Sequence, residues 1–262
     1  MKKSMTILGT VALGMLAVQA SAQANTFDLR LDTNFLTKES VTSAAPIMRL
    51  AVPLGGLTLR ADWGLTVADV ASQTGVKPLN PFIGAGYDIS LGVMNLSIAG
   101  GVALPVLHLS RTKDSVASAT AASVAAAMVG YWDPWLYETN ALSLAFPARL
   151  DLNIPGIDAM VEGGIYFALG TSEGEDSEMG MQAAAEIAFP LLPVLSLGAR
   201  LQTVYLITEE GRFQTSAEPF AQVGLGPLAV RAGLLVNIDE PLGFGFDSDK
   251  YWSAHLGLRL AL

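Results

Sequence analysis

The feature that most constrains this chain is a two-residue alternation of apolar and polar side chains, which begins after Asn25 and repeats to the C-terminus. Such alternation is typical of a β-strand whose two faces meet different surroundings. It recurs in twelve segments, most of them close to the nine to eleven residues with which a tilted strand crosses a bilayer. They are a first segment around Phe27 to Asp32, then 46–54, 57–67, 80–90, 95–109, 141–152, 158–169, 179–189, 195–206, 217–225, 228–238 and 251–262.

Charged residues fall on one face of these segments only. Seven arginines and nine acids lie within them, and all sixteen share the polar face when the apolar residues alone set the register. A charge on a lipid-facing position costs about 2–4 kcal/mol at the membrane midplane for Arg or Lys, which gives this exclusion a physical cause. The four lysines after the N-terminal pair, Lys38, Lys77, Lys113 and Lys250, lie in the longer connections.

The connections between the segments alternate in length. Five are tight and rich in Gly, Pro or Asn: 55–56, 91–94, 153–157, 190–194 and 226–227. Six are longer and polar: 37–45, 68–79, 110–140, 170–178, 207–216 and 239–250. Transmembrane barrels combine short periplasmic turns with longer external loops. The prediction is an all-β protein, a transmembrane antiparallel up-and-down β-barrel of twelve strands with both termini periplasmic; fourteen or ten strands are the alternatives.

The N-terminus carries the pattern of an export signal. Lys2 and Lys3 precede a short apolar run, and small residues follow at the cleavage positions Ala22 and Ala24. We therefore expect residues 1–24 to be a cleaved signal peptide and 25–262 to form the barrel. Without the two lysines, 13 basic residues remain against 24 acidic ones, a balance that argues against nucleic-acid binding. The chain contains no cysteine, so a disulfide framework is excluded.

The last segment resembles a known signal. Residues 251–262, with the sequence YWSAHLGLRLAL, alternate apolar side chains up to Leu262. This stretch is similar to the C-terminal strand that bacterial outer-membrane β-barrels present to their assembly machinery, although that strand often ends in Phe. The resemblance implies export through the periplasm and a location in the outer membrane. It also implies that the barrel assembly machinery and outer-membrane lipid are partners.

The polar face defines the candidate lumen. Twelve strands spaced about 4.8 Å apart and tilted by about 40° close into a barrel roughly 24 Å across, which leaves about 12 Å between inward side chains. The predicted lumen-lining residues are Arg30, Arg49, Arg60, Asp62, Asp88, Arg149, Asp151, Glu162, Glu186, Arg200, Glu218, Arg231, His255 and Arg259. These charges either pair to satisfy a polar interior or line an aqueous pore.

The longest connection, 110–140, contains an Ala-rich stretch at 116–128. Alanine favours helix, so a short helix inside the barrel or a loop folded into the lumen is expected. The competing interpretation is a further strand at 119–131, which would need a second added strand and give fourteen.

Three functions follow as hypotheses. The leading one is a narrow porin-like channel for passive diffusion of small solutes, cationic or neutral because the outer loops are acidic. The second is a structural or surface-interaction barrel with a blocked lumen. The third is an outer-membrane lipid hydrolase in which His108 acts as base and Ser110 as nucleophile, although Arg111 stands where such enzymes carry Asn. No catalytic residue is assigned under the first two, no metal or cofactor is indicated, and the oligomeric state is left open.

Overall fold

The computed structural model describes residues 28–38, 41–70, 73–105, 116–171, 177–207 and 212–262. The predicted signal peptide and the pair His108 and Ser110 lie outside these residues. Thirteen strands lie within the described ranges: β1 Asp28–Lys38, β2 Val41–Leu54, β3 Leu57–Val70, β4 Gln73–Pro78, β5 Phe82–Ser90, β6 Met94–Ala103, β7 Ala141–Ile154, β8 Ile157–Gly170, β9 Glu178–Leu192, β10 Leu195–Leu206, β11 Arg212–Leu225, β12 Leu228–Asn237 and β13 Trp252–Ala261.

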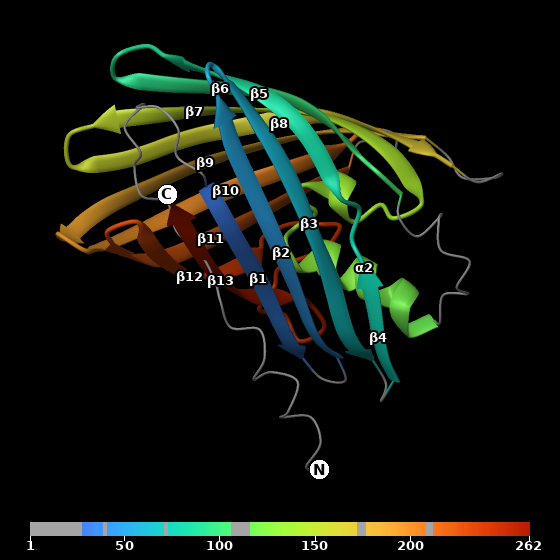
Figure 1. Ribbon diagram of the computed structural model, residues 1–262. Helices are drawn as coiled ribbons and strands as arrows, with labels where there is room; N and C mark the ends of the chain where they lie inside the picture. Colours follow the sequence, from blue (N-terminus) through green and yellow to red (C-terminus); the bar gives the residue numbers. More distant parts are fainter. Residues whose placement is uncertain (1–27, 39–40, 71–72, 106–115, 172–176, 208–211) are drawn as a thin grey trace.

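Twelve of these strands close into an antiparallel barrel (Figure 1). Each pairs with its neighbour in the sequence, except that β3 pairs with β5 past β4, and the ring closes where β1 pairs with β13. Asp28 lies opposite Ala261 and Ala51, so β1 begins and β13 ends at the end of the barrel that carries the tight turns. We call this the turn end and the opposite one the loop end. The predicted fold class and strand count are confirmed, and the periplasmic position of the termini stays a prediction.

Three connections differ from the prediction. The loop expected at 37–45 is wrong, because β1 and β2 continue to a register in which Lys38 lies opposite Val41. Small residues such as Ala45 made this stretch look like a loop, but Ala45 is fully buried on the inner face. The loop expected at 68–79 contains β4, the described strand that is not part of the closed ring. β11 begins at Arg212, inside the loop expected at 207–216.

The two faces of the barrel differ as the alternation requires. Large apolar side chains are exposed on the outer face, as Trp63 and Ile165 show, whereas Asp62, the neighbour of Trp63, is buried on the inner face. A band of exposed apolar residues is what a lipid-facing surface needs. Within the described residues, no helix combines the length and the hydrophobicity needed to cross a membrane.

The Ala-rich stretch forms helix α2, Val116–Met128, and not a strand. A short 3₁₀ helix, η1, follows at Pro134–Leu136. Figure 1 shows α2 at the loop end, close to β3 and β4. We call residues 116–140, which contain α2 and η1 and lead into β7, the inserted segment.

Candidate functional site: a lumen crossed by the inserted segment

Polar side chains from strands on several sides of the barrel bind the backbone of the inserted segment. Four of them donate hydrogen bonds to its carbonyl oxygens: Thr66 to Ala121 at 3.2 Å, Asn237 to Ala127 at 3.5 Å, Ser253 to Met128 at 2.5 Å and Gln202 to Val129 at 2.7 Å. All four donors are buried. Because they come from β3, β12, β13 and β10, the segment crosses the interior and touches the wall on several sides.

The sequence explains why this segment fits there. Alanine gives α2 a narrow cross-section and high helix propensity. The last carbonyls of a helix lack partners within it, and here Asn237, Ser253 and Gln202 satisfy them from the wall. Gly130, with a φ of 60°, ends the helix in the left-handed conformation, where a side chain would collide with Ser216.

An aromatic cluster closes the interior on the side of β5 and β8. The Trp135 side chain is fully buried, with its ring centroid 6.1 Å from that of Phe82 and 6.2 Å from that of Tyr166. Leu136 and Tyr137 are also buried in this cluster. The inserted segment therefore forms a packed partition across this part of the lumen.

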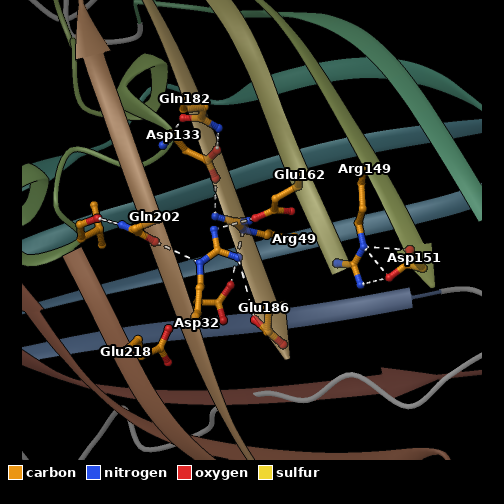
Figure 2. Close-up of polar contacts among 12 residues, drawn as sticks. Asp32, Arg49, Asp133, Arg149, Asp151, Glu162, Gln182, Glu186, Gln202 and Glu218 are labelled. Atoms are coloured by element: carbon orange, nitrogen blue, oxygen red, sulfur yellow. Dashed lines mark hydrogen bonds and ion pairs between the residues drawn. The ribbon is translucent and has the colours of Figure 1, made fainter. Parts of the chain in front are cut away.

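A chain of ion pairs runs along the inner wall next to this partition. Figure 2 shows part of it, with Arg49 between Asp32 and Asp133. The Arg49 guanidinium lies 2.7 Å from Asp133 on the inserted segment and 3.4 Å from Asp32 on β1. His255 places one ring nitrogen 3.1 Å from Asp32 and the other 2.9 Å from Glu218.

The chain continues over β12, β9, β10 and β8. Arg231 lies 3.0 Å from Glu218 and 2.9 Å from Glu186. Arg200 lies 3.9 Å from Glu186 and 2.6 Å from Glu162. A neutral imidazole has only one N–H and cannot donate to two carboxylates, so these contacts require a protonated His255. Positive and negative side chains then alternate along the whole chain of ion pairs.

Four of the other predicted lumen residues form two ion pairs with each other. Arg60 pairs with Asp62, and Arg149 lies 2.6 Å from Asp151. Asp88 is exposed and accepts hydrogen bonds from Thr58 and Ser97. The backbone of Arg30, whose side chain lies outside the description, stands between Arg49 and Arg259 in the sheet register.

Exposure of the inner charges rises away from the inserted segment. The Glu218 side chain is 4% exposed, whereas Arg149 and Asp151 are 29% and 34% exposed. The described charges nearer the turn end, Arg149 and Asp151, are therefore more open to water than Glu218. The sequence placed charges on the inner face but could not show this gradient.

Glu138 lies at the C-terminal end of the inserted segment, in the connection to β7. Burial raises its pKa to about 9, and the nearby Glu178 carboxylate adds to the rise, while a hydrogen bond with Tyr166 opposes it. The single proton of the Tyr166 hydroxyl is donated to Glu178 at 2.5 Å. Glu138 therefore holds its proton at neutral pH, which relieves the repulsion between the two carboxyl groups.

Sequence reasoning missed several residues of this site. Asp133 was not singled out, although it is the sole charged residue between Val116 and Tyr137. Thr66 and Ser253 were also missed, although the two-residue alternation predicts that both face inward. Thr66 lies on the same face of its strand as Asp62, and Ser253 lies on the same face as His255.

Comparison with known proteins gives the fold. No protein-family model and no curated protein matches the chain. Among solved structures, an outer-membrane channel from Pseudomonas putida F1 superposes with a TM-score of 0.57 at 13% identity, covering 93% of this chain and 97% of that one. The KdgM porin superposes with a TM-score of 0.50 at 8% identity, covering 89% and 99%. This chain therefore has the fold of bacterial outer-membrane β-barrels.

Proposed function

We propose that this protein is a narrow porin-like channel of the bacterial outer membrane, which passes small cationic or neutral solutes by passive diffusion. The observation that carries the proposal is the charged inner face of a closed barrel whose outer face is apolar. Charges on the inner face that stay partly exposed, such as Arg149 and Asp151, can line a water-filled path for ions. The fold shared with a channel and a porin supports the proposal.

The preference for cations rests on charge balance. The ion-pair chain contains five carboxylates, counted from Asp133 to Glu162, against three arginines and His255. The loop 239–250 adds Asp239, Glu240 and Asp247, whereas its fourth acid, Asp249, is exposed and lies 3.8 Å from the one lysine of the loop, Lys250. Negative potential at a pore raises the local concentration of cations.

The test is conductance of the purified, folded protein in a planar lipid bilayer. We expect small ion steps and, across a salt gradient, a reversal potential that indicates cation preference. Glu162→Gln should reduce this preference, because Glu162 lies inside the lumen beside Arg200. Asp249→Asn is the matched control, since its side chain is 74% exposed and salt screens it. Absence of ion steps in every salt tested would refute the channel.

The packed inserted segment favours a second function, a barrel with a blocked lumen that acts as a structural or surface-interaction protein. Trp135 and Leu136 are both almost completely buried, which is what a permanent plug requires. This candidate predicts no conductance even after the segment is loosened by mutation, so the same bilayer measurement separates the two functions.

A further inference from the structure

Asp133 is the point at which the inserted segment is tied to the charges of the wall. Its Oδ2 atom lies 2.7 Å from Arg49 Nη2, and its Oδ1 atom accepts a hydrogen bond from Gln182 Nε2 at 3.0 Å. Its backbone N–H also donates to Gln182 Oε1 at 3.0 Å. Both carboxylate oxygens are thus bound by side chains from two strands, β2 and β9, and Asp133 is 4% exposed.

The backbone around Asp133 is held in a conformation that side chains rarely adopt. Tyr131 and Asp133 have φ angles of 59° and 52°, in the left-handed region. Asp tolerates this region, but a bulky residue such as Tyr131 seldom occupies it, and such conformations persist only where surrounding contacts impose them. The contacts of Asp133 therefore hold the backbone at 131–133 in a conformation that its residues do not favour by themselves.

Two arginines of the ion-pair chain contact adjacent residues of the inserted segment, Trp132 and Asp133. From Arg49 the ion-pair chain binds Asp133, and after passing along the wall it returns through Arg200, whose guanidinium lies 4.5 Å from the centre of the Trp132 ring. Arg200 is also fixed by Glu162 and Gln202. The pair 132–133 is thus clamped between two arginines that stand on strands β2 and β10.

From these observations we propose that Asp133 is a latch, a residue whose ion pair with Arg49 keeps the inserted segment closed across the lumen. Removing the Asp133 charge takes away the nearer ion-pair partner of the half-buried Arg49, leaves Asp32 at 3.4 Å, and frees the left-handed turn to relax. The segment then leaves its closed position more often, while the β-ladder of the barrel is untouched. Because unpaired buried charges are costly, Arg49→Gln acts in the same direction from the wall side.

The latch is tested directly by the accessibility of the segment. The chain has no cysteine, so Leu136→Cys, at a position 1% exposed, provides a single buried thiol. In folded protein this thiol should react slowly with a membrane-impermeant maleimide. Adding Asp133→Asn should increase the labelling rate at least tenfold, and adding Arg49→Gln should do the same. Adding Asp249→Asn, which removes an exposed charge, should leave the rate unchanged.

Heat-modifiable migration on gels shows that each variant retains a folded barrel. If Asp133→Asn does not fold, Gln182→Ala replaces it, since it removes two hydrogen bonds of Asp133 and keeps both charges. Equal labelling rates in folded latch variants and in the parent would overturn the proposal.

A second arm measures conductance, and only this arm rests on the proposed channel function. In bilayers, Asp133→Asn should raise the open probability several-fold over wild type. Faster labelling without conductance in any variant supports the latch and removes the channel. Conductance in wild type with unchanged labelling and open probability in the variant keeps the channel and removes the latch.

Discussion

Replacing the fully buried Trp135 by alanine should open the partition across the lumen. The ring packs between Phe82 and Tyr166, and truncation of a buried Trp to Ala costs about 3–5 kcal/mol. Because the ring belongs to the inserted segment and to no strand, this loss falls on the closed position of the segment. At about 1.4 kcal/mol for each factor of ten, the ratio of closed to open populations should drop roughly a hundredfold or more.

The assay is single-channel recording of Trp135→Ala, with heat-modifiable migration to verify that the barrel folds. Larger steps or a strongly raised open probability are expected. Phe246→Ala is the matched control, because this aromatic side chain is 58% exposed and its truncation should change stability by no more than about 0.5 kcal/mol. A folded Trp135→Ala barrel with the conductance of wild type would show that the cluster does not close the lumen.

Three further predictions concern the wall, the acid pair and the lipid face. Gly101→Ala should lower the urea midpoint of unfolding, since its Cβ would lie 2.5 Å from the Ile83 carbonyl oxygen, whereas Gly224→Ala meets no atom within 4 Å and should have little effect. Glu138 binds its proton more tightly in the folded protein, so the free energy of unfolding should fall as the pH rises from 4.5 towards 9. Glu138→Gln should remove that slope, and urea titrations that keep it would contradict the assignment. Ile187→Arg, on the outer face of β9, should cost about 2–4 kcal/mol in lipid bilayers, whereas Ile187→Val should behave nearly as wild type.

The barrel could be predicted because its signal repeats in every strand. Each strand separates a lipid face from a polar face, so parity alone placed Asp62 and Glu218 inside, where the structure buries them. β4 was missed because its sequence, QTGVKP, is short and contains Gly and Pro, and it pairs with β3 alone among the described residues.

The inserted segment could be recognised as helical and expected inside the barrel, but the contacts that hold it there could not be predicted. The Ala-rich stretch favours a helix in any surroundings, whereas its position depends on distant donors: Thr66 lies 55 residues from Ala121, and Ser253 lies 125 residues from Met128. The partners in the ion-pair chain were equally hidden. Parity shows that His255 faces inward, but the register of β1 against β13 decides that it meets Asp32, 223 residues away.

The origin of the wall contacts has a consequence for the order of folding. The groups that hold α2 come from strands near both ends of the chain, β3 early and β12 and β13 late. The complete binding surface for the helix therefore exists only after the last strand has joined the first. During refolding into lipid, the barrel should close first and be permeable for an interval, and occlusion should follow as a separate, later kinetic phase.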